Sequence, residues 1–144
     1  MRLTTLSRYG TRALFDIAYY GQGEAVRASE ISKRQNISLN YIGQIFLKLK
    51  RAGLIKSHRG RSGGYVLSSP PEDVTLLSII EAVEGPISLV TCSGNDKECA
   101  FMDSCVTHDI WVEASKIVGD YFGNITLQNL VDQGKTLGLV REAS

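Results

Sequence analysis

Residues 38–68 read SLNYIGQIFLKLKRAGLIKSHRGRSGGYVLS, and this stretch decides the fold. Its first half has apolar side chains at the i, i+3, i+4, i+7 spacing of one buried helix face, at Ile42, Ile45, Phe46 and Leu49. Ser38 precedes the run as a candidate N-cap and Gly53 follows it as a candidate stop. The spacing therefore predicts a helix over 39–52.

The sequence on either side of this helix predicts the rest of a DNA-binding fold. Upstream, the apolar spacing predicts helices over 7–20 and 28–36, with Arg34 on the outer side of the second. Downstream, the glycine-rich segment 60–64 lies between two strand-like runs, which predicts a β-hairpin. Helix, short helix, tight turn, helix and glycine-tipped hairpin is the order of a winged helix-turn-helix.

The remainder of the chain predicts three more helices after the boundary at Pro70-Pro71, over 75–84, 107–122 and 127–137. The apolar stripe of the helix over 107–122 is wider than packing within one chain requires, so we expect it to form a two-fold interface with a second copy. The expected interface residues are Ile110, Trp111, Ala114, Ile117, Val118 and Tyr121.

The predicted fold class is therefore mainly α with a small β-hairpin wing. We divide the 144 residues into a winged helix-turn-helix domain (1–69), a linking helix with a cysteine-rich loop (70–106), and a dimerisation helix with a C-terminal helix (107–144). A content of 43% hydrophobic and 22% charged residues is typical of a globular chain.

The formal net charge of +1 conceals a strong asymmetry along the chain. Residues 1–65 contain twelve basic and three acidic residues, a balance of +9, whereas 66–144 contain four basic and twelve acidic residues, a balance of −8. No acidic residue occurs between Glu30 and Glu72. Such a distribution indicates a polyanionic partner, and double-stranded DNA fits the predicted fold.

A polar stripe lies opposite the buried face of the helix over 39–52. Its members are Asn40, Gln44, Lys48 and Arg51. Amide side chains at this position can pair bidentately with adenine in a major groove. A solvated face on an ordinary helix is the alternative, but Arg59 and Arg61 in the hairpin favour DNA, because a basic wing tip can enter a minor groove.

All three cysteines fall in one short loop, in the pattern Cys92-x6-Cys99-x5-Cys105-x2-His108. Three thiolates and an imidazole form a complete ligand set for a soft or borderline metal. The wide spacing favours an iron–sulfur cluster over structural zinc, whose ligands usually come in closer pairs. Three unrelated cysteines are disfavoured because no cysteine occurs elsewhere in the chain. The fourth ligand is left open between His108 and a nearby acid, the candidates being Asp96, Glu98 and Asp103.

Several functional classes find no support in the sequence. There is no secretory signal, no apolar run near the roughly 18 residues of a membrane span, and no disulfide framework, so we expect a cytoplasmic protein that spans no membrane. No C-x-x-C motif and no convergent acid–base set occur, so we expect neither an enzyme nor a small-molecule substrate.

The combined motifs resemble the IscR-type family of bacterial winged-helix transcription regulators. The resemblance rests on the opening Met1–Thr4 with Arg8-Tyr9, on Ser38–Tyr41 with Gln44, on the wing 59–65 and on the cysteine loop, in that order along the chain. It implies a homodimer that binds a palindromic DNA operator and senses iron–sulfur or redox status. It also adds Ser38, Tyr41 and Gly60 to the expected DNA-binding residues.

The same resemblance implies the ligands of the cluster. Cys92, Cys99 and Cys105 match the cysteines of the family, and His108 matches the fourth ligand in the branch with a 2Fe–2S centre. The first gap of six residues is one longer than the family's usual five. The branch with a 4Fe–4S centre uses an acid where this chain has Arg8, so 2Fe–2S is favoured over 4Fe–4S.

Overall fold

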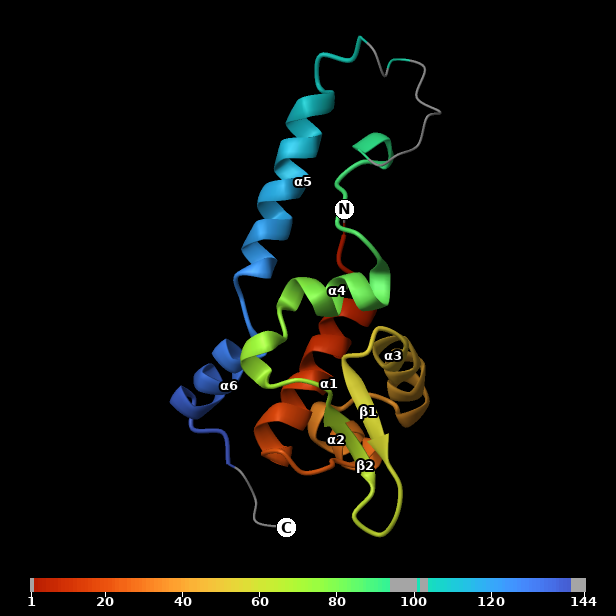
Figure 1. Cartoon of the computed structure of the whole chain (residues 1–144), viewed down its shortest axis with the longest axis vertical. Coiled ribbons are helices and arrows are strands. Elements are labelled where there is room, and N and C mark those ends of the chain that lie inside the picture. The colour runs from red at the N-terminus through yellow and green to blue at the C-terminus, as the bar shows by residue number, and fades with distance from the viewer. Residues whose placement is uncertain (1, 94–100, 102–103, 141–144) are drawn as a thin grey trace.

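The computed structural model describes residues 2–93, 101 and 104–140, and this part of the chain contains six α-helices and one β-hairpin (Figure 1). The elements are α1 (Thr5–Gly21), α2 (Ala28–Gln35), α3 (Leu39–Arg51), β1 (Ile55–His58), β2 (Gly64–Leu67), α4 (Leu76–Glu84), α5 (His108–Gly123) and α6 (Leu127–Thr136), with short 3-10 turns η1 (Pro71–Asp73) and η2 (Thr91–Ser93). The predicted winged helix-turn-helix is confirmed, with element ends shifted by only one or two residues.

The turn between α2 and α3 is built from short-range interactions. Asn36 ends α2 in the left-handed region, with φ of 53°, a conformation that asparagine tolerates better than most residues. The Ser38 hydroxyl accepts a hydrogen bond from the Tyr41 backbone N–H at 3.1 Å, which caps α3 as predicted. Ile37 is buried between the two helices, so the turn is also fixed by the core.

The hairpin is tied to the helical part by a third backbone segment. β1 and β2 pair antiparallel, with Ile55 opposite Leu67 and His58 opposite Gly64. The Val26 N–H donates to the Tyr65 carbonyl at 3.0 Å, and the Val26 carbonyl accepts from the Tyr65 N–H at 2.8 Å. The loop between α1 and α2 therefore fixes the position of the wing relative to the helix-turn-helix.

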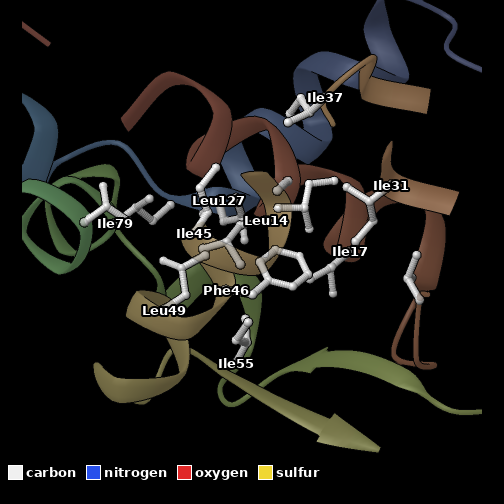
Figure 2. Close-up of a cluster of buried hydrophobic side chains, with 14 of the residues drawn as sticks. Leu14, Ile17, Ile31, Ile37, Ile45, Phe46, Leu49, Ile55, Ile79 and Leu127 are labelled. Atoms are coloured by element: carbon white, nitrogen blue, oxygen red, sulfur yellow. The ribbon is translucent and has the colours of Figure 1, made fainter. Parts of the chain in front are cut away.

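A single hydrophobic core joins the helix-turn-helix to the later helices (Figure 2). α1 lies at its centre and contacts α2, α3, α4, α6 and β2. The predicted inner face of α3 is fully buried, and it meets side chains from α1, α2, β1, α4 and α6, among them Leu14, Ile17, Ile31, Ile55, Ile79 and Leu127. The orientation of α3 is therefore set by the whole core.

The chain leaves the core at α4 and returns to it at α6. The Leu76 N–H donates to the Ile125 carbonyl and the Leu127 N–H donates to the Val74 carbonyl, both at 2.8 Å, which holds the two helix starts together. α5, between them in the sequence, projects away from the core as a long arm (Figure 1). No helix in the described part of the chain is long and apolar enough to cross a membrane.

Candidate DNA-binding surface and cysteine loop

The outer face of α3 presents the predicted polar stripe. All four of its side chains, Asn40, Gln44, Lys48 and Arg51, are exposed. On the opposite face Ile42, Ile45, Phe46 and Leu49 are buried in the core, so the helix cannot rotate without exposing that face. The arrangement leaves two amides and two cations free to contact an external ligand.

Ser38 and Tyr41, two of the expected DNA-binding residues, also anchor the start of α3. The Ser38 hydroxyl accepts the capping hydrogen bond described above. The Tyr41 hydroxyl lies 2.6 Å from the Thr5 hydroxyl of α1, and its ring packs edge-to-face on Tyr9 with centroids 5.7 Å apart. Ser38 therefore fixes the first turn of α3, and Tyr41 holds that turn against α1.

The structure adds two leucines to this face that the sequence analysis did not select. Leu39 and Leu47 are 53% and 52% exposed. Together with Asn40, Gly43 and Gln44 they line a shallow hollow on the outside of α3. The sequence could have identified these leucines by their positions, because residues 39, 43 and 47 are spaced by four and therefore share one side of a helix.

The wing presents Arg59, Gly60 and Arg61 at its exposed tip. Gly60 has φ of +111°, a conformation that residues with a Cβ rarely adopt. The tip is not held by its own strands alone, because the Arg27 guanidinium at the start of α2 donates to the Arg61 carbonyl. Arg27 is therefore a further residue that positions the wing.

An ion pair joins α1 to α2: Arg34 keeps the outward position expected for it on α2 and is paired with a buried carboxylate of α1. Asp16 is fully buried, and its carboxylate accepts from Arg34 Nη2 at 2.7 Å and Nε at 3.0 Å, and from Gln35 Nε2 at 2.9 Å. The hydrogen bond to Asp16 raises the pKa of Arg34. The guanidinium also lies 4.3 Å from the centroid of the Tyr20 ring.

The cysteine loop is only partly described. Cys92 lies in η2, and Cys105 and His108 lie just before and at the start of α5; Cys99 falls outside the described residues, as do Asp96, Glu98 and Asp103. Cys92 and Cys105 are half-buried free thiols. Among the residues that the structure describes, no three metal-ligating side chains are brought together.

The chemistry of the described donors fits a metal centre. A hydrogen bond from Thr107, at 3.4 Å between the Cys105 sulfur and the hydroxyl oxygen, lowers the pKa of the Cys105 thiol. A lowered pKa favours the thiolate, which is the form that binds metals. The Cys105 carbonyl also accepts from the His108 N–H at 3.4 Å, so these two residues are held in one turn.

Ser115 connects both flanks of the cysteine loop. Its buried hydroxyl accepts from the Leu89 N–H at 2.9 Å and donates to the Trp111 carbonyl at 2.8 Å. Leu89 precedes Cys92 by three residues, and Trp111 lies in the first turns of α5. The segment that leads into the loop is therefore attached to the helix that leaves it.

The expected interface residues divide into two groups on α5. Ile110, Trp111, Ile117 and Tyr121 are exposed in the single chain, whereas Ala114 and Val118 are half-buried. Val112 is also exposed, on a different side of α5. Exposed apolar residues along one side of a helix, such as Ile110, Ile117 and Tyr121, are typical of an interaction surface.

Comparisons with known proteins agree with this architecture. The Rrf2 family, described as an iron-dependent transcriptional regulator, matches residues 3–133. An HTH-type transcriptional regulator of Neisseria meningitidis serogroup A is 44% identical over 92% of this chain and 89% of its own length. The HTH-type transcriptional regulator IscR of Pectobacterium atrosepticum is 37% identical over 96% of this chain and 84% of its own length.

Solved structures show the same fold. The IscR of T. potens has a TM-score of 0.78 at 28% identity, covering 99% of this chain and 94% of its own. CymR, the global cysteine regulator of B. subtilis, has a TM-score of 0.76 at 29% identity, covering 92% of this chain and 98% of its own. The resemblance to IscR-type regulators is thus confirmed, and the relatives are regulators and not enzymes.

The family match covers most of the chain, and relatives above 30% identity align along nearly its whole length. Together with the winged helix-turn-helix, these findings show that the protein belongs to the Rrf2 family of DNA-binding transcriptional regulators.

Proposed function

We propose that the protein is a homodimer that reads a palindromic DNA operator with α3 in the major groove and the wing in the adjacent minor groove. The observation that carries this proposal is the exposed stripe of amides and cations on α3. The helix itself packs beside β1 of the arginine-tipped hairpin. DNA-binding helices of this fold place such side chains against base edges, while cations contact phosphates. With chromosomal DNA as the partner, we place the protein in the cytoplasm.

Sequence-specific binding is tested by fluorescence anisotropy on a duplex selected by the protein from a random pool. We expect affinity to fall steeply with salt, because cations on the protein release counterions from the phosphates. Gln44→Ala is expected to reduce discrimination between selected and random duplexes by about 1–3 kcal/mol, the contribution of one bidentate base contact. Gln133→Ala, an exposed glutamine on α6, is the matched control. Salt-independent binding that Gln44→Ala leaves unchanged would contradict the assignment of α3.

We further propose that Cys92, Cys99, Cys105 and His108 hold an iron–sulfur cluster, with 2Fe–2S favoured over 4Fe–4S. The half-buried free thiols of Cys92 and Cys105 and the lowered pKa of Cys105 support this proposal, as does the iron dependence in the family's description. A bound cluster would supply a redox-sensitive group. Since Ser115 ties the loop to α5, we propose that the state of the loop sets the spacing of the two α3 helices across the dimer.

Anaerobic purification with quantification of iron, sulfide and zinc tests the cluster. We expect iron and acid-labile sulfide in equal amounts, with visible absorbance that Cys105→Ala abolishes. Ser104→Ala, at the neighbouring exposed position, is the control and is expected to keep the colour. Retention of full occupancy and an unshifted reduction potential in His108→Ala would remove His108 from the ligand set. Zinc without sulfide would instead identify the alternative, a zinc-stabilised DNA-binding protein without redox sensing.

A further inference from the structure

We propose that Leu39 and Leu47 read the 5-methyl groups of two thymines in the major groove, with Gly43 between them admitting the base edges. This inference rests on the proposed function, because it assumes that α3 enters the groove. It concerns a different property, namely which apolar feature of the operator the helix recognises.

The first observation is the exposure of these leucines on the face that carries the amides. Each is more than half exposed, although their neighbours Ile42, Ile45 and Phe46 are fully buried. The two side chains border the same hollow as Asn40 and Gln44. The surface offered to the groove is therefore mixed, with amides beside branched apolar groups.

The second observation is the gap at Gly43. A Cβ built on this residue would meet no heavy atom within 4 Å, so no packing inside the protein requires glycine here. Glycine inside a helix is less stable than alanine, and no left-handed conformation explains it, because Gly43 has an ordinary helical backbone. A bare position in the middle of this exposed face admits close approach of an external group to the backbone.

The chemistry of the major groove supplies the matching ligand. An A·T pair presents the N7 and N6 groups of adenine, which an amide recognises, and on the same edge the 5-methyl group of thymine. The methyl group is the apolar feature of that edge, and leucine side chains are suited to cover it. Gln44 and a neighbouring leucine can thus contact the two bases of one pair.

Charge and spacing favour DNA over a protein as the occupant of this hollow. Lys48 and Arg51 follow on the same helix and Arg59 lies in the wing, while no acid occurs between Glu30 and Glu72. Leu39 and Leu47 are eight residues apart, about 12 Å along the helix axis. At about 3.4 Å per base pair, the two leucines would reach thymines three to four base pairs apart.

Removal of the methyl groups alone provides the test. The probe is the palindromic duplex selected from a random pool by the full-length protein, with single thymines replaced by deoxyuridine. We expect two thymine positions per half-site, three to four base pairs apart, at which deoxyuridine weakens binding about fourfold, the equivalent of burying one methyl group.

The expected result depends on the leucines in a specific way. Leu47→Ala should weaken binding to the thymine duplex and abolish the effect of deoxyuridine at one position, and Leu39→Ala should do so at the other. Leu137→Ala, which changes a 66% exposed leucine at the end of α6, should leave both effects unchanged. Gly43→Ala should raise the melting temperature, because alanine favours the helix more than glycine does. The same variant should bind DNA more weakly, because the added methyl group occupies part of the hollow.

Two results would overturn the inference. One is a selected duplex in which deoxyuridine has no effect at any position, a measurement that needs no variant protein. The other is that each leucine variant loses as much affinity for the deoxyuridine duplexes as for the thymine duplex. That result would indicate a structural role or a protein partner for this surface. Either result can occur while Gln44 still controls specificity, so a failure here is distinguishable from a failure of the proposed function.

Discussion

Asp16 shows how much the position of α2 depends on one residue. Its fully buried carboxylate is matched by the Arg34 guanidinium and the Gln35 amide. Asp16→Ala leaves these donors without their acceptor. Because Arg34 is one-third exposed, water can partly replace the lost carboxylate, and we expect the free energy of unfolding, measured with urea, to fall by only about 2–3 kcal/mol. Asp120→Ala, which removes an exposed pair with Lys116, should change it by less than about 0.5 kcal/mol. Equal effects of the two variants would contradict a structural role for the buried pair.

Glu84 links stability to pH at the start of α1. Burial raises the pKa of this carboxyl. Hydrogen bonds donated by the Thr4 hydroxyl and by the Thr4 N–H, the latter at 2.8 Å, lower the pKa, and their effect is larger. The pKa of Glu84 therefore lies below the ordinary 4.5. The unfolded chain then binds the proton more tightly, so the stabilisation is present above pH 4.5 and is lost as pH falls through the folded pKa. We expect Glu84→Gln to be less stable by under about 1 kcal/mol at pH 7, with a smaller difference at pH 3. A constant difference across this range in urea titrations would refute the linkage.

Among the elements, the wing depends on a close approach of two backbones. Gly64 has φ of +148°, and a Cβ there would collide with the backbone of Val26. Gly64→Ala is expected to lower the free energy of unfolding by about 1–3 kcal/mol and to weaken DNA binding, because the bridge between Val26 and Tyr65 would have to open. Gly119→Ala in α5, where a Cβ meets nothing within 4 Å, should instead stabilise the protein by up to about 1 kcal/mol. A Gly64→Ala protein with unchanged stability and affinity would show that the bridge is not needed.

At the scale of the whole molecule, we expect α5 to determine whether two copies assemble. Ile117 is 62% exposed in the single chain, so Ile117→Asp should leave the fold intact but place a carboxylate in the apolar surface of the proposed dimer. We expect the wild type to sediment as a dimer at micromolar concentration and Ile117→Asp to sediment as a monomer with weaker DNA binding. Leu137→Asp, at an exposed position outside α5, should remain a dimer. A monomeric wild type would refute the interface.

The sequence by itself determined the elements, because helices and hairpins are set by local rules. The spacing of Ile42, Ile45, Phe46 and Leu49 and the caps Ser38 and Thr75 were enough to locate α3 and α4. The charge asymmetry and the order of motifs were enough to indicate DNA and the family. All of these signals can be read along the chain without knowing which distant segments meet.

The tertiary structure alone decided which residues meet across the chain. Arg34 has an outward position on α2 by its spacing, yet its partner Asp16 lies in another helix. Leu39 and Leu47 are apolar residues of the kind that usually fill a core, and the structure shows that they are more than half exposed and border a hollow on the outside of α3. Ser115 carries no sequence signal, because its role depends on Leu89, which is 26 residues away. Contacts between distant segments depend on the summed packing of all elements, which no local pattern encodes.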